Sequence, residues 1–122
     1  MRSPLIIFCV CVVFVVGCKP RLEKDLVGNW RECYEGCSIL SLRPDHTFSE
    51  RFDEENSTDT YYSGTWSIEG DQLVTRITSA MEMFKELVGQ ENRVIIAEFR
   101  RNSFVTASLE DKSATISYKR VH

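Results

Sequence analysis

Apolar and polar residues alternate along most of the chain after residue 28, in short runs separated by turn residues. A period of two sends successive side chains to opposite faces, which is typical of half-buried β-strands. The breaks contain Pro44 with Asp45 and short clusters of Asn, Asp, Ser and Gly, the residues that turns require. The pattern predicts eight strands, at residues 29–33, 37–43, 47–53, 60–68, 72–79, 93–99, 104–110 and 114–121.

Short connections make consecutive strands antiparallel neighbours, and eight such strands bury one face by forming a sandwich or closing into a barrel. In the run 60–68, Tyr62, Gly64, Trp66 and Ile68 fall on one face, which we predict to be the interior. The other strands supply matching inward residues, namely Leu40, Leu42, Phe48, Phe52, Leu73, Thr75 and Ile77. The pattern therefore predicts a small all-β domain.

Two segments depart from the alternation. The run 94–99 is apolar on both faces, which predicts a strand that is covered on both sides. Ser79 and Glu82 have the spacing of a capping box, and Gly89 supplies a helix end. We predict a helix at about residues 80–88, packed outside the sheet or across one mouth of the barrel. Its apolar stripe comprises Met81, Phe84, Leu87 and Val88.

The stretches LVGNW (26–30), DHTF (45–48) and GTWSIEGDQL (64–73) follow one another in the first half of the domain. They resemble the repeated signature of bacterial lipocalin-like lipoproteins, in which L-x-G-x-W, D-G-T-F and G-x-W-x-I-x-G-D-x-L recur in this order. The departure is His46, which stands where Gly is usual, so the turn differs there or strains a non-Gly residue. The resemblance implies an up-and-down barrel of about eight strands and a cavity for a small ligand.

The N-terminus has the three parts of an export signal: Arg2, an apolar run over residues 5–16, and a small residue, Gly17. As a helix the run is roughly 18 Å long, short of the ~30 Å hydrocarbon core of a bilayer. The run ends in VVGC, which resembles the bacterial lipobox. The resemblance implies cleavage before Cys18 and a lipid on its sulfur, whereas an ordinary secretory signal or an uncleaved short anchor is the alternative. The predicted organisation is signal peptide 1–17, lipid-anchored tether 18–25 and a single β-barrel domain 26–122.

A lipid-anchored chain of this kind belongs to the bacterial envelope. Lys19, rather than Asp, follows the predicted lipid-bearing cysteine. Under the enterobacterial sorting convention this residue is compatible with the outer membrane. We therefore expect the domain at a membrane surface, with the periplasmic face of the outer membrane favoured.

The chain has five cysteines, two of them in the predicted signal and one at the lipidation position, Cys18. Cys33 and Cys37 remain. The loop 34–36 between them ends in Gly and would set the two cysteines opposite each other on adjacent strands, within reach of a disulfide. Free thiols, or a metal or redox role together with His46, are the alternatives, although the C-x3-C spacing differs from the C-x2-C of redox and zinc motifs.

Charge and residue types narrow the function. The chain carries 15 basic and 18 acidic side chains, and the basic ones are scattered, so we predict no nucleic-acid partner. The mature chain's histidines, His46 and His122, lack an evident nucleophile or acid partner, so we predict no catalytic residue and a non-enzymatic protein. The acidic segment 53–59 has the composition of a solvated turn more than of a cation site. We predict neither a metal nor a cofactor.

Two binding functions follow. The first is an interaction with an envelope protein through loops or a barrel rim, with segment 53–59 as the first surface to test for a basic partner, and an inhibitor of a wall hydrolase as one form. The second is a lipocalin-like carrier of a small apolar ligand. Its predicted lining is Trp30, Leu40, Leu42, Phe48, Phe52, Tyr62 and Trp66. A hollow interior would favour the carrier, and a packed interior with an exposed apolar patch would favour the protein partner. We favour the protein partner because these aromatic residues can fill a small barrel.

Overall fold

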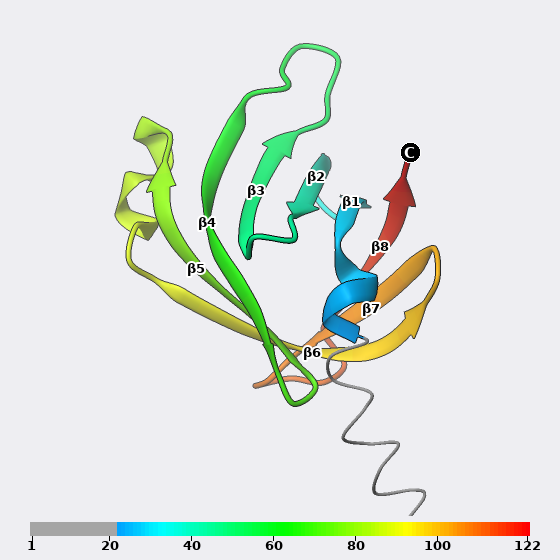
Figure 1. Ribbon diagram of the computed structural model, residues 1–122. Coiled ribbons are helices and arrows are strands. Elements are labelled where there is room, and N and C mark those ends of the chain that lie inside the picture. The colour runs from blue at the N-terminus through cyan, green and yellow to red at the C-terminus, as the bar shows by residue number, and fades with distance from the viewer. Residues whose placement is uncertain (1–21) are drawn as a thin grey trace, which may run out of the picture.

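The computed structural model describes residues 22–122, which contain a closed eight-stranded antiparallel barrel with the strands in chain order (Figure 1). The strands are β1 (Gly28–Cys33), β2 (Cys37–Leu42), β3 (Thr47–Phe52), β4 (Thr60–Glu69), β5 (Gln72–Ala80), β6 (Glu91–Arg100), β7 (Ser103–Ser108) and β8 (Thr115–Val121). The barrel closes where β1 pairs with β8, with Asn29 opposite Val121. The predicted all-β barrel of eight strands is confirmed.

The barrel interior contains the residues that the alternation placed there. Trp30, Phe48, Phe104, Leu26 and Leu42 are the largest fully buried side chains among the described residues. They belong to one apolar cluster, which comprises Leu26, Trp30, Leu40, Leu42, Phe48, Trp66, Ile68, Leu73, Ile77 and Phe104. Burial of this apolar surface is the main force that holds the strands in a closed ring.

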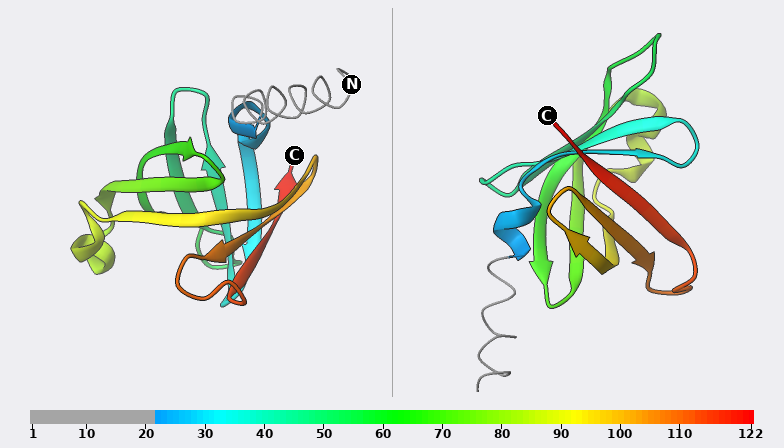
Figure 2. Two further views of the ribbon diagram at one scale, coloured as in Figure 1. Left: turned by 90° about the horizontal axis from the view of Figure 1, so that it is seen from below. Right: turned by 90° about the vertical axis from the view of Figure 1, so that its right-hand side faces the viewer.

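A short helix at residues 22–26 covers one end of the barrel, here called the closed end (Figure 2). The indole Nε1 of Trp30 donates a hydrogen bond to the carbonyl oxygen of Leu26 at 2.8 Å. The Arg120 guanidinium lies 4.2 Å from the centre of the Trp30 ring. Arg120 also donates to the carbonyl oxygen of Asp25 at 2.9 Å, so β8 holds the helix against β1. These contacts satisfy carbonyl groups at the helix C-terminus.

The folded region begins before residue 26. Leu22 packs against the apolar cluster, so the predicted tether 18–25 overlaps the helix from residue 22 onward. The predicted signal 1–17, the lipidation position Cys18 and the first part of the tether lie outside the described residues. Within residues 22–122, none of the helices has the length and apolar character needed to cross a membrane.

Strand β6 differs from the expectation that the apolar run 94–99 is covered on both sides. A β-bulge shifts its pairing with β7 between Ile96 and Glu98. The bulge adds a residue on one side, so Val94, Ile96 and Phe99 all pack against the barrel core although their spacing is not even. Ala97 is exposed. The prediction that this strand is covered on both sides is therefore wrong: the bulge brings Phe99 to the inner face, whereas Ile95 and Ala97 remain on the outer face.

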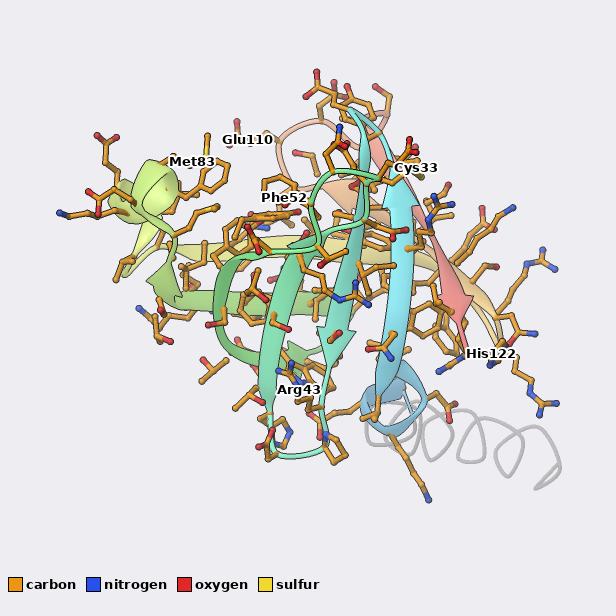
Figure 3. All side chains as sticks on the ribbon, turned by 90° about the horizontal axis from the view of Figure 1, so that it is seen from above. Cys33, Arg43, Phe52, Met83, Glu110 and His122 are labelled. Atoms are coloured by element: carbon orange, nitrogen blue, oxygen red, sulfur yellow. A yellow bond between two sulfur atoms is a disulfide. The ribbon has the colours of Figure 1, made fainter. Side chains whose placement is uncertain are left out.

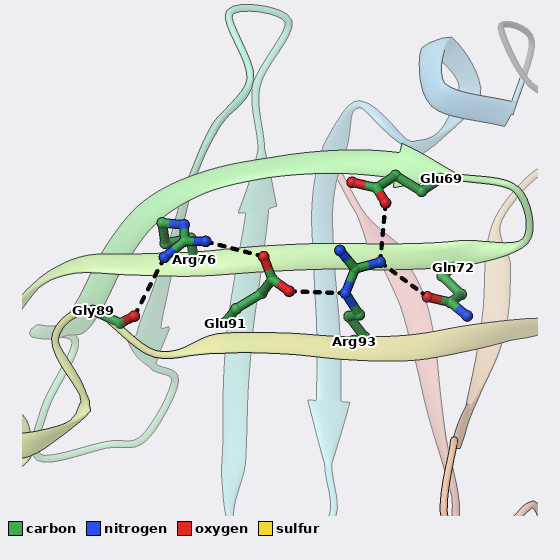
Figure 4. Close-up of polar contacts among 6 residues, drawn as sticks. All are labelled: Glu69, Gln72, Arg76, Gly89, Glu91 and Arg93. Carbon is green, nitrogen blue, oxygen red and sulfur yellow. Dashed lines mark hydrogen bonds and ion pairs between the residues drawn. The ribbon is translucent and has the colours of Figure 1, made fainter.

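The outer face of β4, β5 and β6 carries a row of ion pairs in place of a cover (Figure 4). Arg93 contacts Glu69 at 3.0 Å and Glu91 at 2.8 Å, and Arg76 contacts Glu91 at 3.1 Å. The hydrogen bond from Arg93 lowers the pKa of the Glu91 carboxyl. These side chains remain in contact with water, so their pairing sets strand neighbours more than it adds stability.

The predicted helix at 80–88 is a shorter 3₁₀ helix, η1 (Glu82–Leu87). Ser79 belongs to β5, and the residue before η1 is Met81, which makes no side-chain capping bond. The predicted capping box is therefore wrong. Residue 79 is taken up by strand pairing with Ser63, which competes with the local helix signal. Figure 1 shows η1 beside the end of β5 rather than across the barrel.

The turn between β2 and β3 contains the non-Gly residue that the sequence marked. His46 has a φ of 69°, in the left-handed region that Gly adopts more easily. Its ring lies 5.5 Å from the ring of Trp66, and its Nε2 lies 3.3 Å from a Glu23 oxygen. The Trp66 indole donates to the carbonyl of Arg43 at 2.9 Å. These contacts hold the strained turn over the closed end.

Candidate functional site

The end of the barrel opposite the helix, here called the open end, has a different interior. The connections after β1, β3, β5 and β7 lie there. Six inward side chains of this half are only partly buried, namely Glu32, Glu50, Phe52, Tyr62, Ile116 and Tyr118. Ser38, which pairs with Glu32 and Phe52, is buried among them, and most of the core cluster of the closed half is fully buried. The open half is therefore less completely shielded from solvent than the closed half.

Glu50 is the centre of this half. It lies on β3 between the inward residues Phe48 and Phe52, opposite Tyr62 on β4. The Tyr61 hydroxyl donates to Glu50 Oε2 at 2.8 Å, and the Tyr62 hydroxyl donates to Oε1 at 3.2 Å. Each carboxylate oxygen thus has a phenol donor.

The rings around Glu50 form a continuous aromatic wall. The Tyr61 ring centre lies 4.7 Å from those of Tyr62 and Phe52, and 5.5 Å from that of Phe84 in η1. Because Tyr61 and Tyr62 are adjacent in the chain, a normal strand would send them to opposite faces. The register of β3 and β4 shifts between Glu50 and Arg51, which is where both hydroxyls reach the same carboxylate.

Electrostatics make Glu50 an unusual carboxyl group. Burial raises its pKa, and the charge of Glu32 raises it further, although the hydrogen bonds from Tyr61 and Tyr62 act in the opposite direction. Burial, followed by the charge of Glu50, also raises the pKa of Tyr118. Two carboxyl groups therefore share one half of the interior, where an added positive charge would be stabilised.

The raised pKa of Glu50 predicts a pH-dependent stability. A carboxyl whose pKa is higher in the folded than in the unfolded state stabilises the fold at low pH, and this contribution is lost as the pH rises through the folded pKa. We expect Glu50→Gln to equal the wild type below the ordinary pKa of 4.5 and to be more stable at neutral pH, by on the order of 1 kcal/mol. Urea unfolding of both proteins over a pH series measures this. The exposed Glu98→Gln is the control, and a stability difference between Glu50→Gln and the wild type that stays constant at all pH values would contradict the prediction.

The predicted lining residues divide between the two halves. Trp30, Leu40, Leu42, Phe48 and Trp66 are buried in the core cluster, where they pack against one another. Phe52 and Tyr62 are partly buried and lie in the open half. The accessible part of the interior is therefore polar and aromatic rather than purely apolar.

The two remaining cysteines are joined. Cys33, the last residue of β1, and Cys37, the first residue of β2, form a disulfide, with a Cα–Cα distance of 4.0 Å. Gly36 has a φ of 90°, the left-handed conformation expected at that loop position. The bond leaves neither sulfur as a thiolate for a metal. His46, the suggested third ligand, belongs to the turn that begins at Arg43, and Figure 3 places Cys33 and Arg43 at opposite ends of the barrel.

Removal of the disulfide is expected to lower the free energy of unfolding moderately. A loop this short gains about 2 kcal/mol from cross-linking in the chain-entropy model. We expect the Cys33→Ser/Cys37→Ser variant to lose about this amount in urea unfolding, and the wild type to lose the same amount on reduction. A loss in the variant that persists when both proteins are reduced would contradict the assignment to the bond, because the two chains should then be equally stable.

The other candidate residues have structural roles or lie exposed. His46 contacts Glu23 and Trp66 in its turn, and His122 is exposed at the end of the chain. In segment 53–59, Asp53 pairs with Arg31 at 2.6 Å. Across residues 22–122 there is no group of three or more His, Cys, Asp or Glu side chains arranged to hold a metal ion.

Glu50 and Glu32 were absent from the predicted site, although the alternation contained a signal for both. In TFSERF, Glu50 has the same parity as the inward Phe48 and Phe52. In GNWREC, Glu32 has the same parity as the inward Trp30. A carboxyl group on an inward stripe is uncommon in a barrel interior, because burial disfavours its charged form.

Comparison with known proteins concerns the fold. No protein-family model matches the chain, and no curated protein matches it significantly. Among solved structures, the chain is similar to the crystal structure of a lipocalin-like protein from Bacteroides uniformis, with a TM-score of 0.57 and 11% sequence identity. The alignment covers 80% of this chain and 99% of that chain. The eight-stranded barrel described here therefore has a lipocalin-like fold.

Proposed function

We propose that the protein is a lipid-anchored, non-enzymatic binding module of the bacterial envelope, and that the open half of its barrel takes up a small ligand with an apolar body and an amine. The observation that carries the proposal is the Glu50 carboxylate, held by the Tyr61 and Tyr62 hydroxyls in a partly exposed barrel interior. An apolar core alone would require no carboxyl group there.

The chemistry of the open half fits a cation. A protonated amine donates hydrogen bonds to a carboxylate, and such charge-assisted bonds are about twice as strong as neutral ones. Aromatic rings such as those of Phe52, Tyr61 and Phe84 attract a cation over their faces. A carboxylate ligand would meet Glu50 and Glu32 with like charge, which disfavours anions in this half.

Three molecules with the same tail test the ligand class: n-octylamine, n-octanol and octanoate. We expect isothermal titration calorimetry to detect the tightest binding for the amine. In Glu50→Gln the preference for the amine over the alcohol should fall by at least about tenfold, since one hydrogen bond to a charged group contributes about 1.5–3 kcal/mol. Glu98→Gln, on the outer face, should keep the preference. Equal binding of all three molecules, or an unchanged preference in Glu50→Gln, would exclude this proposal.

The anchor is proposed from the lipobox-like stretch before Cys18. Intact-mass spectrometry on the protein from its native membrane should show a chain that starts at Cys18 and carries lipid mass, and Cys18→Ala should lack that mass. The location that we propose for the anchored protein is the periplasmic face of the outer membrane. An unmodified, soluble wild-type chain would reject both the lipid anchor and this location.

An envelope protein partner is the second candidate function. The observation that favours it is the exposure of Met83 and Tyr34, each with 72% of its surface accessible, at the open end. Large apolar side chains at this exposure are typical of interaction sites when they occur together. An inhibitor of a wall hydrolase is one form that such a partner interaction would take.

A further inference from the structure

The four connections at the open end, residues 34–36, 53–59, 81–90 and 109–114, form a surface that we call the rim. Cys33, Phe52, Met83 and Glu110, which lie in or next to these connections, gather on the same side of the molecule in Figure 3. Arg43 and His122 lie on the other side. The rim is therefore one end of the barrel, built from four separate pieces of chain.

The rim concentrates exposed apolar side chains. The exposed large hydrophobic residues among residues 22–122 are Tyr34 (72%), Met83 (72%), Val88 (46%) and Leu109 (43%), and all of them lie in rim connections. Three different connections contribute them, so a single irregular loop does not account for the exposure. Folding gains little from these side chains, because they contact water rather than the core.

The rim is also strongly acidic. Its connections contain two basic residues, Lys85 and Lys112, and nine acidic residues, which are Glu35, Asp53, Glu54, Glu55, Asp59, Glu82, Glu86, Glu110 and Asp111. Arg31 neutralises Asp53, and Lys85 contacts Glu82. The connections at the closed end are balanced: they hold Arg43 and Arg101 against Asp45 and Asp71. The negative charge is thus a property of one end.

The disulfide loop and the acidic segment 53–59 support each other. The Asp53 backbone N–H donates to the Cys37 carbonyl at 3.0 Å, and a Glu54 carboxylate oxygen lies against Gly36. The Cys33–Cys37 bond restrains the loop on which Tyr34 is displayed. This part of the rim is therefore held in place before any partner arrives, which lowers the entropy lost on binding.

The negative charge of the rim indicates which class of partner it would bind. Anionic lipid surfaces, nucleic acids and the rim of a second copy all carry like charge and would be repelled. The acidic side chains do not converge into a metal-ion group within the described chain. A basic polypeptide matches the charge, and apolar side chains on it would cover Met83 and Leu109. Met and Tyr are enriched in the buried centres of protein interfaces.

We infer that the rim docks a basic polypeptide segment that carries apolar side chains among its lysines or arginines. This inference rests on the second candidate function, a protein partner, and is independent of ligand uptake near Glu50. The described chain begins with the helix at the closed end, on the same side as Arg43 in Figure 3, so an anchor at Cys18 would attach the barrel at the end away from the rim. That orientation exposes the rim to proteins of the envelope.

Three labelled peptides of equal length test the partner chemistry: alternating Lys and Leu, alternating Lys and Ser, and alternating Glu and Leu. Fluorescence anisotropy with the full-length chain should give the tightest binding for Lys–Leu. Lys–Ser should bind more weakly, because it lacks apolar contacts, and Glu–Leu should not bind. Equal affinity for Lys–Leu and Lys–Ser, or binding of Glu–Leu, would overturn the inference.

Variants then locate the binding surface. Glu55→Lys in the rim should weaken Lys–Leu binding by about tenfold, whereas Asp71→Lys, the same change of charge at the closed end, should change it by less than about twofold. Met83→Ser should weaken binding by at least about threefold without a change of charge. Equal effects of Glu55→Lys and Asp71→Lys would show a general response to net charge and would refute the rim as the site. An unchanged affinity in Met83→Ser would refute its apolar part.

The same variants separate the two proposals. Glu50→Gln should leave Lys–Leu binding unchanged, and Glu55→Lys should leave the octylamine preference unchanged. Peptide binding that requires Glu50 would assign the peptide to the barrel interior and overturn docking on the rim. Failure of octylamine binding with intact peptide binding would reject only the ligand.

Discussion

Trp30→Ala is expected to lose about 3–5 kcal/mol of unfolding free energy, because it removes a fully buried aromatic side chain and leaves a cavity at the closed end. The indole ring contacts Phe104 edge-on at 4.7 Å between centroids and supports the Arg120 guanidinium. Its Nε1 also satisfies the Leu26 carbonyl. Since small domains have about 5–15 kcal/mol in total, the loss is a large share of the stability.

Urea unfolding followed by far-ultraviolet circular dichroism measures this loss. Trp30→Phe is the matched variant, because it retains an aromatic ring against Phe104 but removes the hydrogen bond to Leu26. We expect it to lose clearly less than Trp30→Ala. A Trp30→Ala variant within about 1 kcal/mol of the wild type would mean that the closed end repacks, and that Trp30 does not hold the helix in place.

Gly64→Ala is expected to be comparably severe, with a loss of at least about 3 kcal/mol. Gly64 is on β4 at a register shift, where the neighbouring β5 backbone comes very close. An added Cβ would overlap the carbonyl oxygen of Arg76 and would lie 2.9 Å from its carbon and 3.0 Å from the Thr78 nitrogen. All three are backbone atoms, so the pairing of β4 with β5 would have to open.

Gly70→Ala provides the comparison. Gly70 has a φ of 66°, so alanine is strained there, but no atom lies within 4 Å of an added Cβ. A left-handed alanine costs about 1–2 kcal/mol. Chemical unfolding should therefore rank Gly64→Ala as much less stable than Gly70→Ala. A reversed or equal ranking would show that the strands separate easily at the bulge.

Another β-bulge, in β6, explains one error of the sequence-based prediction. Alternation located all eight strands, because each strand buries one face and each turn carries its own residue types. It failed at β6, where Phe99 joins Val94 and Ile96 on the inner face only because the strand gains a residue at the bulge. A bulge depends on the partner strand, and the partner is a long-range choice that a local pattern does not encode.

The predicted helix cap and the predicted site also differ from the structure because long-range strand pairing outweighs local signals. Ser79 and Glu82 fit a capping box, yet Ser79 pairs with Ser63 in the sheet, and strand pairing outweighs the cap. The disulfide was one of several readings of a C-x3-C spacing until β1 and β2 placed Cys33 opposite Cys37. Glu50 was not predicted as a site residue, and its parity with Phe48 and Phe52 was the signal that could have indicated it. Its two tyrosine donors come from a strand that a register shift brings into reach.

The strands, their order, the inward aromatic stripe and the meander could be predicted from local patterns, because they depend on side-chain alternation and on turn residues close in the chain. The closed end of the barrel and the distribution of charge between its two ends could not, because both depend on how the strands close into a ring. The same holds for the contact of Glu50 with Tyr61 and Tyr62 and for the placement of Tyr34, Met83 and Leu109 on one rim. These features join residues from separate strands and connections, and only barrel closure brings such residues together.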